Sequence, residues 1–156
     1  MGRGLALGID ETGENVARWA GRLAARLRAV PEASYGPTDK KLSKDDLKVY
    51  NLGKEVFNRE AHCGTCHQPD GKGMPPAFPA LSGSKIVTGP LLSPDGKLLK
   101  DSHVDRVLNG KEGTAMQAFR NTLNDVELAA VITYERNALG NSKGDLIQPA
   151  QIKALR

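Results

Sequence analysis

The pattern of apolar and polar residues along the chain predicts amphipathic helices separated by long loops. In residues 14–30, apolar residues recur at spacings of three and four and would share one helical face: Val16, Trp19, Leu23, Leu27 and Val30. Arg18, Arg22 and Arg26 form a separate basic stripe. Such a helix can lie on an anionic membrane or dock on a partner. It can equally pack on its own domain or be sequence added for expression.

Three further helices are predicted downstream. The first begins at residues 43–46, whose Ser-x-x-Asp pattern resembles a capping box, and runs into the cysteine-containing segment. A short helix is predicted over 102–108, where Asn-Gly follows and stops it. The last spans about 124–140, and Asn124 with Glu127 at the third position gives it another cap signature.

The remaining segments are expected to be loops, which makes the outline all-α. Residues 68–100 are rich in Gly and Pro, and the SPDG sequence at 93–96 is a turn signal. The tail after residue 141 is predicted to be irregular, with three apolar side chains against the body: Ile147, Ile152 and Leu155.

This organisation divides the 156 residues into one domain with additions at both ends. Residues 1–34 are an extension of unassigned role that contains the basic helix, and 35–45 are a linker, in a part of the chain where residues 31–42 carry two prolines and a glycine. The folded domain is expected at 46–141, and 142–156 form the tail that packs on it.

Composition and charge narrow the classes of function. Aromatic residues make up only 4% of the chain, so a bulky cofactor could fill the centre, although an Ala- and Leu-rich helical core explains the figure equally well. The net charge of +4 comes without a long basic run or a basic stripe interleaved with aromatics, which argues against nucleic acid. No apolar run approaches transmembrane length, and residues 1–30 lack the apolar centre of a signal peptide.

The strongest chemical signal is the sequence CGTCH, which contains both cysteines, Cys63 and Cys66, followed at once by His67. A disulfide between them would close a very small loop and add little stability. A thioredoxin-like pair should follow a strand, whereas a helix is predicted here. A structural zinc site needs four ligands. This motif supplies three, and the fourth would have to be His62 or His103, neither of which belongs to it.

Covalent haem attachment makes better use of this spacing. On one helical turn, Cys63 and Cys66 share a face, and each can form a thioether with one vinyl group of a haem. His67 then projects beneath the ring, where its imidazole can ligate the iron. We therefore predict one covalently bound haem c at this motif.

The second axial ligand decides what such a haem does, since two protein ligands favour electron transfer over binding of small molecules. Met116 is the preferred candidate, because it lies 49 residues after His67 in a polar loop between two predicted helices. Met74 follows His67 too closely, and His62 would face the wrong way. His103, at the start of the short helix, is the one serious rival.

These residues together resemble the class I cytochromes c over about 46–141, from LGKEVFNREAHCGTCH to ELAAVITYERN. The resemblance implies an all-α fold of helices and long loops wrapped around one haem. It also implies that Gly53 and Phe57 pack against the C-terminal helix, with Leu128 and Tyr134 at the partner positions. The FPALSG sequence matches the family's Pro-x-Leu loop, so the Pro79 carbonyl is expected to accept a hydrogen bond from His67 Nδ1. GTAMQAF matches the loop of the axial methionine and supports Met116.

A closer resemblance is to the cytochrome c domain fused to subunit II of some bacterial haem-copper cytochrome c oxidases. It rests on FPALSGSKIVTGP, DSHVDRVLNGKEGTAMQAF and AAVITYERNALGNSKGDLIQPAQIKAL. Such a subunit also carries a binuclear copper centre, for which residues before 46 supply no cysteines, so the chain is expected to be the haem domain alone or a free relative.

The resemblance implies a carrier of single electrons and not an enzyme in itself. Electrons would arrive from a soluble cytochrome or a quinol-oxidising complex and pass to the copper-containing oxidase. Docking would use lysines near the haem edge, for which Lys72, Lys85 and Lys111 are candidates by position. A membrane would be reached only through the parent complex or through residues 14–30. Because the family matures outside the cytoplasm, we expect the periplasm or the periplasmic face of the inner membrane. The alternatives are a freely diffusing periplasmic cytochrome c, and a haem enzyme or gas sensor whose methionine ligand is labile.

Overall fold

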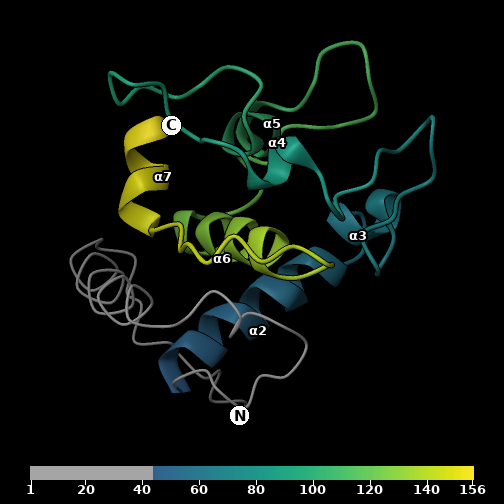
Figure 1. The fold of residues 1–156 in the computed structure, drawn as a ribbon, viewed down its shortest axis with the longest axis horizontal. Coiled ribbons are helices and arrows are strands. Elements are labelled where there is room, and N and C mark those ends of the chain that lie inside the picture. The colour runs from purple at the N-terminus through teal and green to yellow at the C-terminus, as the bar shows by residue number, and fades with distance from the viewer. Residues whose placement is uncertain (1–43) are drawn as a thin grey trace.

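The computed structural model describes residues 44–156, and the regular structure in that range is helical, as the sequence predicts (Figure 1). In chain order the helices are α2 (Lys44–Asn58), α3 (Cys63–His67), α4 (Lys85–Thr88), α5 (His103–Asn109), α6 (Asp125–Asn137) and α7 (Pro149–Leu155). The basic helix predicted at 14–30 and the linker up to residue 43 lie outside the described residues. No helix of the described range is long and apolar enough to cross a membrane.

Helices α2 and α6 cross at close range and form the centre of the fold (Figure 1). At the crossing α2 carries Gly53, where an added Cβ would lie 2.2 Å from the Ala130 carbonyl oxygen and 2.6 Å from Tyr134 Cβ. A glycine is required because any side chain would push the two backbones apart. The fully buried ring of Phe57 packs on the Tyr134 ring, with 5.6 Å between centroids. The packing of Gly53 and Phe57 that the resemblance implied is therefore present.

Side-chain caps define where α5 and α6 begin. The Asn124 side chain accepts hydrogen bonds from the backbone N–H groups of Val126 and Glu127 at 3.0 and 2.9 Å. The Glu127 carboxylate accepts one from the Asn124 N–H at 3.2 Å, which completes the capping box predicted from the sequence. Helix α5 begins one residue later than predicted, because the Ser102 hydroxyl caps it by accepting from the Asp105 N–H at 3.3 Å.

The prediction of an irregular tail is wrong for its last residues, which form α7. Pro149 occupies the first turn, where its missing N–H costs no hydrogen bond. The Gln151 side chain accepts a hydrogen bond from the Gln148 N–H at 2.8 Å. Ile152 is fully buried and Ile147 is nearly so, and α7 packs on α6. The sequence did not indicate α7 because the helix is short and its capping glutamine is not among the usual cap residues.

A buried arginine ties α6 to the loops around it. Arg136 is 1% exposed, and its Nε donates to the Asp145 carboxylate in the tail at 2.9 Å. Its Nη1 donates to the carbonyl oxygens of Val87 and Gly89 at 2.6 and 3.0 Å. The buried Asn141 side chain adds a bond from its amide nitrogen to the Leu81 carbonyl at 3.0 Å. These contacts hold the segment at 81–89 in place, and that segment forms one wall of the site described next.

Candidate functional site

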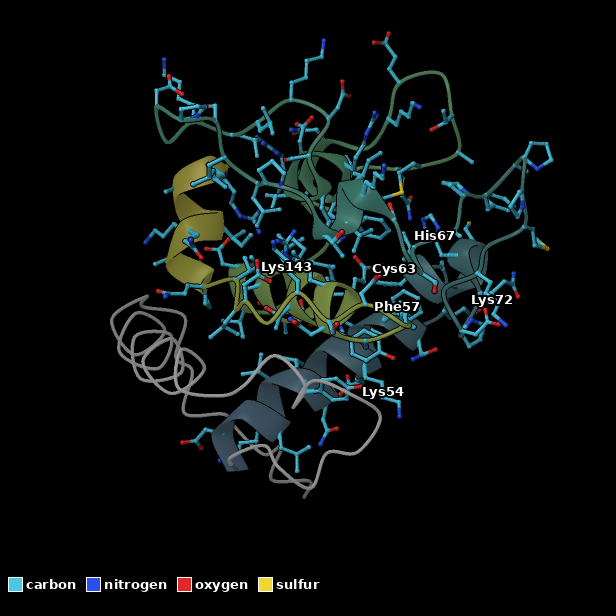
Figure 2. All side chains as sticks on the ribbon, in the orientation of Figure 1. Lys54, Phe57, Cys63, His67, Lys72 and Lys143 are labelled. Carbon is cyan, nitrogen blue, oxygen red and sulfur yellow. The ribbon has the colours of Figure 1, made fainter. Side chains whose placement is uncertain are left out.

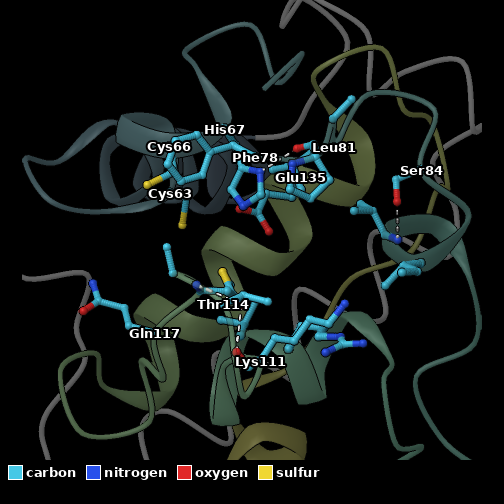
Figure 3. Close-up of a pocket in the computed structure, with 18 of the residues that line it drawn as sticks. Cys63, Cys66, His67, Phe78, Leu81, Ser84, Lys111, Thr114, Gln117 and Glu135 are labelled. Carbon is cyan, nitrogen blue, oxygen red and sulfur yellow. Dashed lines mark hydrogen bonds between the residues drawn. The ribbon is translucent and has the colours of Figure 1, made fainter. Parts of the chain in front are cut away.

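A cavity of about 400 Å³ lies between α3, the loop at 76–81, α5 and the loop at 111–119 (Figure 3). Its walls are mostly apolar and include Phe78, Leu81, Val87, Val107 and Phe119. Deep pockets with apolar walls and a few convergent polar groups are typical of ligand and cofactor sites. The core of this protein therefore has room for a bulky group, as its few aromatic residues suggested.

The CGTCH motif forms the single turn α3 and lines this cavity. Figure 2 shows Cys63 and His67 just beyond Phe57, where α2 ends and α3 follows. Cys63 is buried and Cys66 is partly exposed, and both are free thiols. Burial first, and the nearby Glu135 carboxylate second, raise the pKa of the Cys63 thiol well above its usual range. The thiol is thus protonated at neutral pH, which argues against a reactive thiolate of the thioredoxin type.

A zinc site is also disfavoured. Within residues 44–156, no group of three or more His, Cys, Asp or Glu side chains is arranged to hold a metal ion. A structural zinc ion needs four such ligands and a catalytic one needs three. Of the four chemistries considered for the motif, attachment of a haem is the one left without a structural objection.

His67 is oriented by the loop that follows it. Its Nδ1 and the Pro79 carbonyl oxygen are hydrogen-bonded at 2.8 Å, the contact that the Pro-x-Leu resemblance implied. Because the carbonyl can only accept, Nδ1 carries the proton and Nε2 keeps its lone pair for a metal ion. The loop reaches this position because Gly73 has φ +63 and lies so close to Phe78 that an added Cβ would be 2.4 Å from its carbonyl oxygen.

Met116 lies in a loop held by its own hydrogen bonds. The Met116 carbonyl accepts from the Lys111 N–H at 2.9 Å, and its N–H donates to the Thr114 hydroxyl at 3.2 Å. That hydroxyl donates to the Lys111 carbonyl at 2.8 Å. The Gln117 amide reaches across to the Ala61 carbonyl at 3.3 Å. Figure 3 shows Thr114 and Gln117, which flank Met116, across the cavity from His67.

The rival ligands are placed less well. His103 is 3% exposed and its Nε2 is hydrogen-bonded to the Glu135 carboxylate at 2.5 Å. His62 bonds through Nδ1 to the Glu60 carbonyl at 2.9 Å. Met74 is 51% exposed and does not line the cavity, whereas Met116 does. Of the two methionines in the described residues, only Met116 lines the cavity, and it stays the predicted ligand opposite His67.

Two charged side chains at the cavity, Glu135 and Arg106, were not singled out from the sequence. Glu135 belongs to α6 and pairs with His103 of α5, 32 residues away in sequence. Arg106 and Lys111 add positive charge to the lining. Helical periodicity could have placed Glu135 on α6, but no local pattern indicates that its carboxylate meets an imidazole from another helix.

The residues present fit a covalently held haem. Two thiols one helical turn apart, an imidazole with its second nitrogen already bonded and a thioether across the cavity form the donor set. The apolar walls suit the porphyrin plane, and Arg106 and Lys111 suit its carboxylates.

Comparisons with known proteins agree with this chemistry. A sequence model of the family described as cytochrome C oxidase, cbb3-type, subunit III matches residues 49–134. The chain is also similar to a protein of Gluconobacter oxydans (strain 621H) described as alcohol dehydrogenase (quinone), cytochrome c subunit, with 28% identity over 143 residues. The match covers 85% of this chain and 29% of that relative, so the chain spans about three tenths of its length. These likenesses support the cytochrome c domain and its all-α fold, and they do not single out subunit II of a haem-copper oxidase.

Proposed function

Because this chain belongs to the cytochrome c family described as cbb3-type cytochrome c oxidase, subunit III, we propose that it carries single electrons through one covalent haem c ligated by His67 and Met116. Electron transfer through haem follows from the family, and the ligand pair and the covalent attachment are our assignment. One observation carries it: His67, its Nδ1 bonded to the Pro79 carbonyl, lines the same apolar cavity as Met116 and both cysteines.

The chain's residues would each do a separate part of this work. When bound, the haem supplies an iron that accepts and returns one electron. Thioethers from Cys63 and Cys66 would fix the ring in the cavity, and the Pro79 carbonyl makes the His67 imidazole a stronger donor. The soft Met116 sulfur favours the reduced state. If His67 and Met116 both held the iron, no position would be left for a substrate, and the domain would act as a carrier and not as a catalyst by itself.

The proposed partners are other redox proteins of a respiratory chain. The relative named above is a cytochrome c subunit of a quinone alcohol dehydrogenase, which supports electron input from a dehydrogenase or a quinol-oxidising complex. The resemblance to oxidase subunit II supports output to a copper-containing oxidase. We propose the periplasm or the periplasmic face of the inner membrane as the location of this exchange, because haem attachment in the family occurs outside the cytoplasm.

Visible spectroscopy of the haem-loaded protein tests the proposal. We expect a low-spin spectrum in both oxidation states, and no change when carbon monoxide is added to the reduced protein. Rapid binding of carbon monoxide would instead indicate an open position and a gas-binding function.

Substitution of the methionine tests the ligand itself. Met116→His should keep a low-spin spectrum but lower the reduction potential, because an imidazole replaces a soft thioether. Met74→His, at an exposed position away from the cavity, is the matched control and should leave the potential unchanged. Equal potentials for Met116→His and the wild-type protein would refute the assignment.

A further inference from the structure

The most unusual feature of the cavity is a buried pair of ionisable side chains. His103 of α5 and Glu135 of α6 are 3% and 2% exposed, and His103 Nε2 lies 2.5 Å from Glu135 Oε2. Both residues line the cavity that Cys63 and His67 also line, and Figure 3 shows Glu135 on the same side of that cavity as Cys63. The pair is thus part of the immediate surroundings of the proposed haem.

The pair is poorly explained by stability alone. Removing a carboxylate from water is costly, and the attraction of one partner offsets that cost only when the remaining polar atoms are also satisfied. Among residues 44–156, however, the buried His103 Nδ1 has no hydrogen-bond partner. Two well-packed apolar residues of similar volume would serve the fold at least as well. This leaves a role in the chemistry of the cavity.

The charge of Glu135 is not neutralised by the nearby arginines. Arg136, the next residue in sequence, directs its guanidinium to Asp145 and to the carbonyls of Val87 and Gly89. Arg106, which also lines the cavity, is bonded to Asp101 at 2.8 Å. His103 Nε2 is hydrogen-bonded to the carboxylate, and its Nδ1 has no partner among the described residues.

This charge acts on the residue that would hold the haem. Glu135 and Cys63 line the same cavity, and the carboxylate is the second cause, after burial, of the raised pKa of the Cys63 thiol. A fixed anion beside a centre that gains an electron stabilises the oxidised form more than the reduced form. Inside a protein the effect is much larger than for an exposed acid, whose field is weakened by water and salt.

We propose that the buried Glu135 carboxylate, oriented by a hydrogen bond from His103, lowers the reduction potential of the haem-loaded domain. His103 acts through Glu135 and is a positioning residue. The inference rests on the proposed function, since it needs a haem in this cavity. The Glu135 carboxylate would offset the rise in reduction potential that a methionine ligand causes.

The reduction potential of two variants tests this. Glu135→Gln keeps the shape of the side chain and removes the charge, so the equilibrium constant for reduction should rise about tenfold, which corresponds to about 59 mV for a one-electron couple. The control is Glu55→Gln, which removes the same charge from a side chain of α2 that is 65% exposed and should leave the potential unchanged. An unchanged or lower potential in Glu135→Gln would overturn the inference.

A double variant guards against loss of folding. His103→Leu with Glu135→Leu replaces the pair by apolar side chains, and we expect a protein at least as stable as the wild type with the same rise in potential. Loss of stability with an unaltered potential would show that the pair is merely structural. Failure of the proposed function would appear separately, as carbon monoxide binding by the reduced wild-type protein, whatever the variants do.

Discussion

The α2–α6 crossing and the Met116 loop are held together by different physics. At the crossing, Gly53 lets two helical backbones touch, and the rings of Phe57 and Tyr134 fill the space beside it. The Met116 loop instead depends on a few hydrogen bonds among Lys111, Thr114 and Met116, with exposed side chains on either side. Packing of the first kind is cooperative and supports the whole domain, whereas loop contacts of the second kind can open locally. The contacts that keep the domain folded are thus separate from those that hold the loop of the proposed ligand Met116.

A substitution at the crossing should have the largest effect. Gly53→Ala places a Cβ 2.2 Å from the Ala130 carbonyl oxygen, a clash with backbone that no rotamer relieves. We expect a loss of stability of about 3 kcal/mol, at the upper end of typical overpacking costs, measured by thermal unfolding. Lys54→Ala, on the exposed face of the same helix, is the control and should leave the melting temperature close to that of the wild type. A Gly53→Ala variant as stable as the control would mean that the crossing is not tightly packed.

Substitutions at two glycines of the Met116 loop should distinguish an effect on the ligand Met116 from an effect on stability. Gly110 and Gly113 both have positive φ, +70 and +75, so alanine is strained at either position, and Gly110, with ψ −163, lies in a region that is essentially restricted to glycine. An added Cβ at Gly110 would lie 2.5 Å from the Met116 carbonyl oxygen, whereas at Gly113 it meets nothing within 4 Å. We expect the reduced Gly110→Ala protein to bind carbon monoxide and the Gly113→Ala protein to resist it. If both behave alike, backbone strain and not the contact with Met116 governs the loop.

The smallest of these effects should come from one hydroxyl. Thr114→Val removes the group that accepts from the Met116 N–H and donates to the Lys111 carbonyl. Each exposed bond contributes about 0.5–1 kcal/mol, so the population of the open loop should rise several-fold. The rate of carbon monoxide binding to the reduced protein measures this population, and Thr114→Ser, which keeps the hydroxyl, should restore the slow rate. Equal rates for the valine and serine variants would exclude a role for the hydroxyl.

The sequence was sufficient to predict those elements that depend on residues close together in the chain. The capping box of Asn124 and Glu127 placed the start of α6, and the CGTCH spacing placed two thiols and an imidazole on one turn. The short α4, which forms within the Gly- and Pro-rich segment, and α7, which begins with a proline, were not predicted. Both are short, and a short helix gains most of its stability from tertiary packing and little from propensity. Ile152, fully buried in α7, illustrates this dependence.

The sequence by itself determined the chemistry that is available: two thiols and a histidine at fixed spacing, one methionine in a suitable loop, and a helical pattern that could surround a haem. Only the tertiary structure decided how these groups meet. It joined the His103 imidazole of α5 to the Glu135 carboxylate of α6, and it placed that carboxylate in the wall of the cavity that Cys63 and Met116 also line. The reason is physical, since spacing along one helix fixes relative positions within a turn, whereas a contact between α5 and α6 depends on how every intervening loop packs.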